Sequence, residues 1–152
     1  MIYDLRDREV PMYLTLGCLV AAGVYALFNG FWPPILLTIV LIFVADIKSR
    51  TKRLVLALSF SAFVTLFQLD SGLINTVIVG IWLLWETGVI GGADAKLLIA
   101  ITLLTGNPAI LIPIAVTGGV QGVFASLRKQ KDIPFVVSIF CGSLLFVLYP
   151  LI

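Results

Sequence analysis

Long apolar runs, separated by short polar or Pro- and Gly-containing intervals, make up almost the whole chain. Hydrophobic residues account for 61% of the 152 residues and charged residues for 12%, whereas about one quarter of a soluble domain is charged. The sequence therefore predicts an integral membrane protein with a single all-α domain over residues 1–152. Its expected architecture is a polytopic transmembrane bundle of about six to seven helices with short loops.

The apolar runs also give the expected positions of the membrane spans. Several runs are shorter than the ~20 residues that a perpendicular helix needs to cross the hydrocarbon. A thin or locally deformed membrane boundary, or helices that span only half of the bilayer, would accommodate them. The expected spans cover residues 11–28, 33–46, 54–69, 73–87, 94–105, 109–127 and 133–151.

Basic residues lie only in alternate intervals. If every run crosses the membrane, all ten Lys and Arg residues fall on one face, and the loops of the other face carry a single charge, Asp70. Because Lys and Arg concentrate in cytoplasmic loops, the basic face is expected to be cytoplasmic. A re-entrant run at 94–105 would move the basic segment 128–132 outside, so the runs 94–105 and 109–127 are expected to form a crossing hairpin. The basic residues are Arg6, Arg8, Lys48, Arg50, Lys52, Arg53, Lys96, Arg128, Lys129 and Lys131.

Composition excludes several kinds of site. The chain has no His, which excludes Ser-His-Asp and Cys-His nucleophile pairs, His-ligated haem and His-containing zinc sites. Cys18 and Cys141 lie far apart within apolar runs and form no C-x-x-C pair, so both are expected to be buried small hydrophobic groups. A net charge of +2 does not indicate a nucleic-acid partner. We expect no metal, and we expect the lipid bilayer itself to be a partner.

The N-terminal segment does not have the pattern of a cleavable signal peptide. It opens with the polar sequence MIYDLRDREVP, whereas a signal peptide begins with a basic region and an apolar core. The membrane segments themselves are therefore expected to direct the chain to the cell membrane, as a protein with several crossings.

The stretch VIGGADAKLLIA at 89–100 places Asp94 at the predicted cytoplasmic boundary. Asp is a favoured N-cap residue, so Asp94 can simply begin a helix, with Lys96 reaching toward water. The alternative is a functional role, because ionisable groups at membrane depth are costly and usually functional. Gly91 and Gly92 permit close approach of another chain to Asp94.

Hydrolysis by carboxylates requires a second acid beside Asp94. Two carboxyl groups about 3 Å apart can share a proton, so that one acts as base toward water and the other as acid toward the scissile carbonyl. Asp4 and Asp46 are the two candidates at the predicted depth, whereas Asp70 is expected on the opposite face. Glu86 is interpreted as an interfacial residue, with a third acidic member of the site as the alternative.

The segments YDLRDREVP and GGADAK together resemble the prepilin and preflagellin peptidases, which are membrane aspartic proteases with a G-x-G-D type motif. The first segment fits the family pattern D-x-R-x-R-x-I/V-P. The second is similar to the archaeal form, in which the residue before the aspartate need not be Gly, and here that residue is Ala93. KDIPFVVSIFCG at 131–142 is similar to a late basic and Pro-Phe segment of the family. The first pattern is filled by Asp4, Arg6, Arg8, Val10 and Pro11.

The resemblance implies an aspartic endopeptidase that cleaves short basic class III signal peptides from pilin-like or flagellin-like precursors at the cytoplasmic face. Asp94 and Asp4 would be the catalytic pair, and two carboxyls and water need no cofactor. In the family a hydrophobic helix usually precedes the first aspartate, whereas three residues precede Asp4 here, which keeps Asp46 open as the partner of Asp94. The chain also lacks the Cys-rich insertion that accompanies N-methylation in the bacterial branch.

Three basic residues near the aspartates have two interpretations. Arg6, Arg8 and Lys96 either set the topology as charges at the cytoplasmic boundary, or lower the pKa of a nearby carboxyl and help to place the substrate. Since the substrate signals in this family are themselves basic, the topological interpretation is favoured.

Two other classes of function stay open from the sequence. One is a small transporter or channel in which Asp94 and a partner bind a cation or relay protons. The other is a non-catalytic membrane subunit derived from the peptidase family. Four aromatic residues are interpreted as interfacial or packing groups, namely Trp32, Trp82, Trp85 and Tyr149.

Overall fold

A computed structural model describes residues 12–127 and 135–148. This part of the chain is all-helical and contains no strand, which confirms the predicted α class. Its α-helices are α2 (Met12–Phe28), α3 (Trp32–Ala45), α4 (Arg50–Phe67), α5 (Gly72–Glu86), α6 (Gly92–Thr105), α7 (Leu111–Leu127) and α8 (Phe135–Leu148), and two short 3₁₀ turns lie at η1 (Leu69–Ser71) and η2 (Pro108–Ile110).

The helices coincide with the apolar runs because the intervals carry residues that start or stop helices. Pro33 lies in the first turn of α3, where its missing N–H has no helical partner to lose. Gly106 ends α6 in the left-handed conformation, with φ of 58°, and Pro108 follows it. A Cβ at Gly106 would lie 2.9 Å from the ring of Phe31, so glycine also allows the α2–α3 connection to pack against this helix end.

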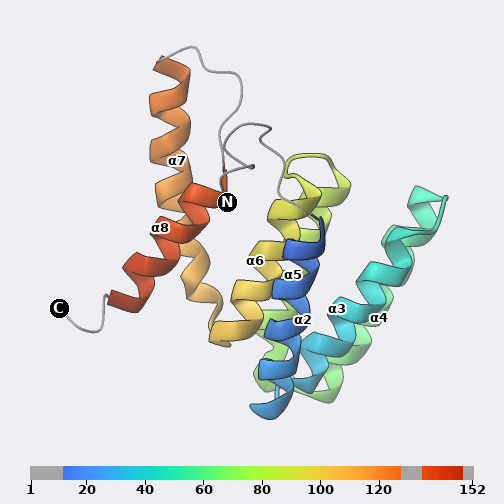
Figure 1. The fold of residues 1–152 in the computed structure, drawn as a ribbon. Coiled ribbons are helices and arrows are strands. Elements are labelled where there is room, and N and C mark those ends of the chain that lie inside the picture. The colour runs from blue at the N-terminus through green and yellow to red at the C-terminus, as the bar shows by residue number, and fades with distance from the viewer. Residues whose placement is uncertain (1–11, 128–134, 149–152) are drawn as a thin grey trace. The chain divides into compact units, whose positions relative to one another are not determined.

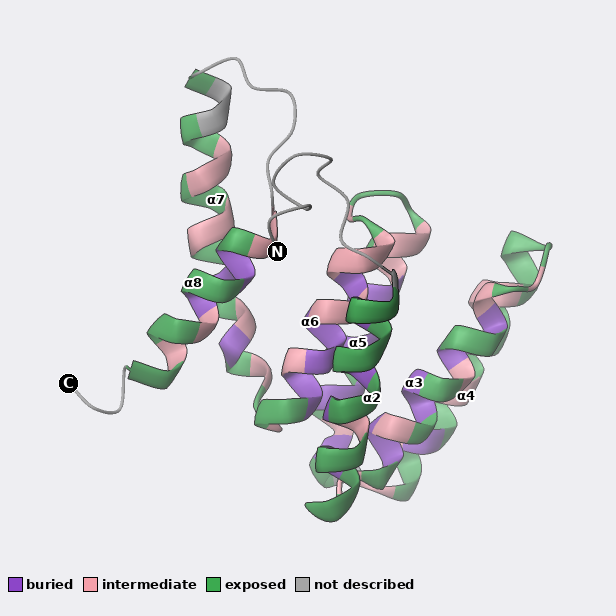
Figure 2. Ribbon diagram, viewed as in Figure 1, coloured by how far each residue is buried: buried purple, intermediate pink, exposed green. Residues whose placement is uncertain are grey.

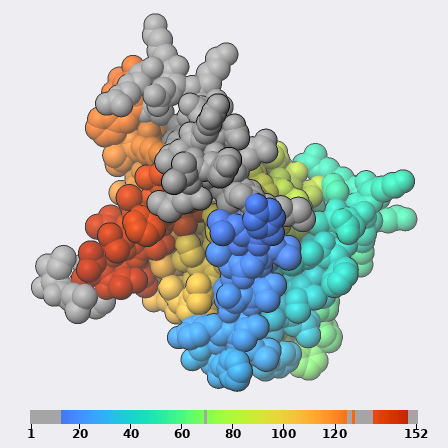
Figure 3. All heavy atoms as spheres, in the orientation of Figure 1, coloured from blue at the N-terminus to red at the C-terminus, as the bar shows by residue number. Residues whose placement is uncertain are grey.

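Helices α2–α6 form one compact unit, Met12–Pro108. Successive helices run in opposite directions, so the α3–α4 and α5–α6 connections lie at one end and the α2–α3 and α4–α5 connections at the other (Figure 1). In the space-filling view, α2 (blue) lies between α6 (yellow) and α3 (cyan) (Figure 3). The unit is therefore an up-and-down bundle in which α2 packs against helices that come later in the chain.

The core of this unit lies on the facing sides of its helices. Leu37 and Leu41 of α3, Ile78 and Trp82 of α5 and Leu103 of α6 are all 2% exposed or less. The opposite sides of the same helices carry exposed residues, seen as green bands in Figure 2. These outward faces are themselves apolar, with large side chains such as Phe28, Phe43, Leu66 and Leu73.

Both cysteines of the chain also lie among the exposed residues. Cys18 in α2 and Cys141 in α8 are exposed, so the prediction that both are buried is wrong. Each lies within an apolar run, but an apolar run does not reveal which of its residues face the interior of the bundle.

In the described part of the chain, no helix combines the length and the apolar character that crossing a membrane requires.

Helices α7 and α8 belong to a second compact unit and pack against each other through small and polar residues. The Thr117 hydroxyl donates a hydrogen bond to the backbone oxygen of Ser138 at 2.9 Å, and the Ser138 hydroxyl bonds to the side-chain oxygen of Gln121. Gly142 of α8 lies directly on α7: a Cβ there would come within 2.4 Å of the Cα of Ile114. The two backbones approach this closely only because Gly142 has no side chain.

Substitution of Gly142 by Ala tests this packing. We expect Gly142→Ala to lower the free energy of unfolding by about 1–3 kcal/mol, because the added methyl group overlaps backbone that cannot move aside without separating α7 from α8. The matched control is Gly119→Ala in α7, where a Cβ has nothing within 4 Å and the better helix former is neutral or stabilising. Thermal unfolding of the purified chain measures both, and equal stability of the two variants would contradict the packing described.

Candidate functional site

Charged side chains gather at one end of the α2–α6 unit. Of its nine charged residues, eight lie in or beside the α3–α4 and α5–α6 connections or in the first two turns of α6. The ninth, Asp70, lies in η1 at the other end, as the charge pattern predicted. We call the first of these ends the charged end; its members are Asp46, Lys48, Arg50, Lys52, Arg53, Glu86, Asp94 and Lys96.

An ion pair joins three helices at the charged end. The Arg53 guanidinium lies 2.5 Å from the Glu86 carboxylate at the C-terminus of α5. Another guanidinium N–H of Arg53 donates to the backbone oxygen of Ala45, in the last turn of α3, at 3.4 Å. The Glu86 side chain is only 7% exposed and that of Arg53 is 23% exposed. Arg53, from the first turn of α4, therefore ties together the ends of α3, α4 and α5.

Asp94 lies in the first turn of α6, although it does not cap the helix. The helix begins two residues earlier than the apolar run suggested, and its N-cap is Gly91, which makes no side-chain capping hydrogen bond. The N-cap interpretation of Asp94 is therefore wrong, because Gly92 and Ala93 already have helical geometry. The Asp94 side chain is half-buried and turns back toward Gly91: a Cβ at Gly91 would lie 3.3 Å from Oδ2 of Asp94. A carboxylate here is favoured by the partial positive charge of the helix N-terminus.

Gly92 brings the start of α6 against α5. A Cβ at this position would lie 3.1 Å from the indole nitrogen of Trp85, so any larger residue would displace the indole or the helix. Gly91, by contrast, is exposed. The double glycine thus serves two purposes, since one member allows close helix packing and the other leaves the approach to Asp94 open.

A cavity of about 300 Å³ opens beside the charged end and is lined by residues of α2, α3, α5 and α6. Its lining includes one acidic residue, Asp46, and one basic residue, Lys96. Trp82 and Trp85 line the same space, and the indole N–H of Trp82 is buried without a hydrogen-bond acceptor among the described residues. A ligand in this cavity would lie beside residues of both charges. Among the described residues, no three His, Cys, Asp or Glu side chains cluster in a way that could hold a metal ion.

Asp94 is not part of the cavity lining, whereas Asp46 is. The lining residues of α6 include Gly92, Lys96 and Ile99, which share one face of the helix. Asp94 is two residues from both Gly92 and Lys96, which places it on the opposite face of α6. Asp46 and Lys96 thus line the same cavity, and Asp94 does not line it.

Three further residues singled out in the sequence, Asp4, Arg6 and Arg8, lie outside the described residues. Ala93, which precedes Asp94, is half-buried in the first turn of α6. The described part of the site thus consists of Asp94 and its glycine turn on one face of α6, and the Asp46–Lys96 cavity on the other.

The sequence did not reveal the role of Glu86, which was interpreted as an interfacial residue. Its side chain is buried and paired with Arg53. The only signal in the sequence is an acidic residue at a helix end, in a chain whose boundary residues are mostly basic. That signal does not identify Arg53 as the partner of Glu86. Trp82 and Trp85 are interpreted as packing or interfacial groups, and in the structure Trp82 is buried in the core while Trp85 packs against Gly92.

The Arg53–Glu86 pair provides a stability test of the charged end. Glu86→Gln leaves the guanidinium of a partly buried arginine without its counter-ion, and we expect a loss of about 1–3 kcal/mol in the free energy of unfolding. The matched control, Asp70→Asn, removes an exposed carboxylate at the other end of the bundle, and we expect it to change stability by less than about 0.5 kcal/mol. Denaturant unfolding of Arg53→Gln, Glu86→Gln and the double variant gives the coupling energy, and additive effects would show that the pair does not join the helices.

Comparison with known protein families, with curated proteins and with solved structures finds no match to this chain. The resemblance to the prepilin and preflagellin peptidases thus rests on the residues of the Asp4 and Asp94 segments themselves.

Proposed function

We propose that this protein is a membrane aspartic endopeptidase that removes short basic signal peptides from pilin-like or flagellin-like precursors at the cytoplasmic face of the cell membrane. Asp94 and Asp4 are its catalytic pair. The observation that carries the proposal is the position of Asp94: a half-buried carboxylate in the first turn of a helix, behind a glycine turn, at the charged end of an otherwise apolar bundle.

Three features support a membrane location. Large apolar side chains cover the outward faces of the described helices, which in water would expose far more apolar surface than soluble monomers tolerate. Helices α7 and α8 contain no charged residue and pack through glycine and hydroxyl groups, a mode typical of helices in lipid. The charges of the α2–α6 unit lie almost entirely at one end, which is the distribution that a membrane boundary imposes.

The surroundings of Asp94 support a protease site. Exposed Gly91 lets an extended peptide approach without obstruction by a side chain. The first N–H groups of a helix point outward along its axis, so a carbonyl oxygen near this end would meet hydrogen-bond donors as well as the carboxyl group. Such an arrangement suits a tetrahedral intermediate, whose oxygen becomes negative during peptide hydrolysis.

Two observations support Asp4 over Asp46 as the second acid. Asp46 lines the cavity with Lys96, on the face of α6 that Asp94 does not share. Asp4 lies in the segment that matches the family pattern D-x-R-x-R-x-V-P, directly before α2. Helix α2, which follows this segment in the chain, packs along α6, the helix that carries Asp94.

The proposed reaction needs only the two carboxyl groups and water. One ionised carboxylate takes a proton from water while the other, protonated, carboxyl donates its proton to the scissile carbonyl oxygen. The resulting diol collapses as the carboxylate that had donated its proton takes one back from a diol hydroxyl, the C–N bond breaks, and the proton taken from water is passed to the leaving amine. The pair returns to its initial state with a single shared proton, so neither a metal nor an organic cofactor is consumed.

A cleavage assay tests the catalytic pair. The substrate is a synthetic precursor with a basic segment followed by an apolar segment, incubated with the chain reconstituted in vesicles. We expect Asp94→Asn and Asp4→Asn each to lower the cleavage rate by at least about 100-fold, because positioned acid and base groups contribute roughly 10²–10⁴ to the rate. Asp70→Asn is the matched control and is expected to cleave at the unaltered rate.

The same assay separates the alternatives. Full cleavage by Asp94→Asn, with folded protein present, would overturn the proposal. Loss of cleavage in Asp46→Asn but not in Asp4→Asn would reverse the choice of partner. Ion flux through the vesicles that Asp94→Asn abolishes, in the absence of cleavage, would indicate a transporter instead.

A further inference from the structure

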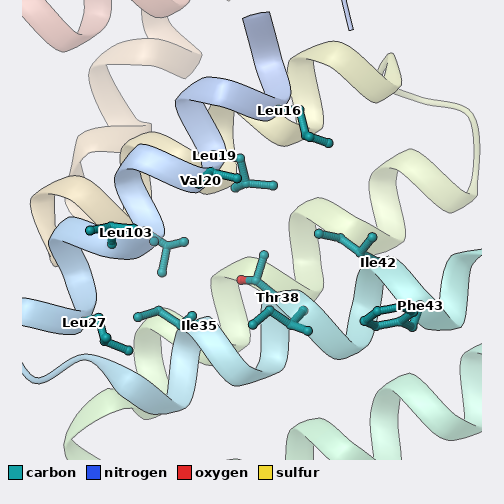
Figure 4. A pocket seen from close by; sticks show the side chains of 12 residues that line it. Leu16, Leu19, Val20, Leu27, Ile35, Thr38, Ile42, Phe43 and Leu103 are labelled. Carbon is teal, nitrogen blue, oxygen red and sulfur yellow. The ribbon is translucent and has the colours of Figure 1, made fainter. Parts of the chain in front are cut away.

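An apolar groove runs between α2 and α3 for most of their length. A cavity of about 440 Å³ lies between these helices, with Leu103 of α6 at its side (Figure 4). It shares four lining residues with the cavity at the charged end, so the two spaces adjoin each other. The shared residues are Leu16, Leu19, Thr38 and Ile42. We call the combined space the α2–α3 groove and its Asp46–Lys96 end the mouth.

The dimensions of the groove suit a single hydrocarbon chain. On α2 it extends from Leu16 to Leu27, which at 1.5 Å per residue is about 16 Å. Its lining residues are apolar apart from Thr38, so an elongated apolar group suits it better than a polar peptide backbone.

The mouth carries groups of both charges. Neither the Asp46 carboxylate nor the Lys96 ammonium forms an ion pair with another residue of the described chain. Asp46 and Lys96 both line this end of the groove. The mouth thus offers one cationic donor and one anionic acceptor at the end of an apolar channel.

We propose that the α2–α3 groove binds one acyl chain of a phospholipid whose headgroup carries both a phosphate and a primary amine. The phosphate pairs with Lys96, and the amine pairs with Asp46. The inference rests on the membrane location under the proposed function, but it is independent of proteolysis, since Asp94 lies on the other face of α6. A bound lipid would keep α2 and α3 at a fixed separation beside the helix that carries Asp94.

Two glycines of α2 offer a matched pair of variants. Gly23 lines the groove and an added Cβ meets nothing within 4 Å, so Gly23→Phe fills the groove without a clash. Gly17 also has open space around an added Cβ but lines neither cavity, so Gly17→Phe adds the same side chain to the same helix outside the groove. Both substitutions replace glycine in a helix, so differences in helix propensity cancel between them.

Native mass spectrometry of the full chain in detergent measures the bound lipid after addition of phosphatidylethanolamine, phosphatidylglycerol or phosphatidylcholine. We expect one tightly held phosphatidylethanolamine per chain, retained by Gly17→Phe and weakened about tenfold or more by Gly23→Phe. Asp46→Asn is expected to remove the preference for phosphatidylethanolamine over the other two lipids, whereas Lys96→Gln is expected to weaken the binding of all three, since all three carry the phosphate.

The competing outcomes overturn the inference. Equal lipid retention by Gly23→Phe and Gly17→Phe would show that the groove is not the binding site. Equal retention of all three lipids by the unaltered chain would show that the mouth does not distinguish one headgroup from another. Displacement of bound lipid by the synthetic precursor would assign the groove to the substrate. Lipid binding is expected not to depend on Asp94, so Asp94→Asn retains the lipid whether or not it cleaves the precursor. Failure of the lipid site and failure of the proposed protease activity are therefore distinguishable.

Discussion

Confinement of charge to one end of the bundle is the constraint on which the rest of the structure depends. Within Met12–Pro108 the helices have apolar outward faces as well as an apolar core, and in the membrane location that we propose charged side chains have no favourable place along their length. Burying an unpaired charge costs far more than any single packing contact contributes. The charges are therefore left to the connections and helix ends, which fixes the direction of each helix and collects the reactive side chains in one layer.

The pairing within this layer sets the geometry of the candidate site. Arg53 links the end of α5 to the end of α3 through Glu86 and the Ala45 oxygen, and so determines where Asp46 lies. Gly92 then allows α6 to start against Trp85, which directs Lys96 toward the cavity and Asp94 away from it. One helix thus separates two chemical environments: a carboxylate at an open glycine turn on one face, and a lipid-sized groove with a charged mouth on the other.

Much of the fold was predictable from the sequence, because helices in this chain coincide with apolar runs. The run at 33–46 corresponds to α3 (Trp32–Ala45) and the run at 73–87 corresponds to α5 (Gly72–Glu86), since proline, glycine and charged residues mark these boundaries. The start of α6 was misplaced by two residues, because glycines give no positive signal for a helix start although Gly91 caps the helix here. The exposed positions of Cys18 and Cys141 were also missed, because runs that are apolar all round carry no periodicity that marks the buried face.

The sequence by itself determined the helical class, the positions of the helices and the gathering of charge at alternate connections, since all three depend on local composition. It also determined that Asp94 follows a glycine turn at such a connection. Only the tertiary structure decided that Arg53 pairs with Glu86, that Asp46 shares a cavity with Lys96 rather than with Asp94, and that α2 and α3 leave a groove between them. Those arrangements depend on how each helix is rotated about its axis, and in helices with apolar residues on every side that rotation is set by close packing at particular glycines, which no local pattern encodes.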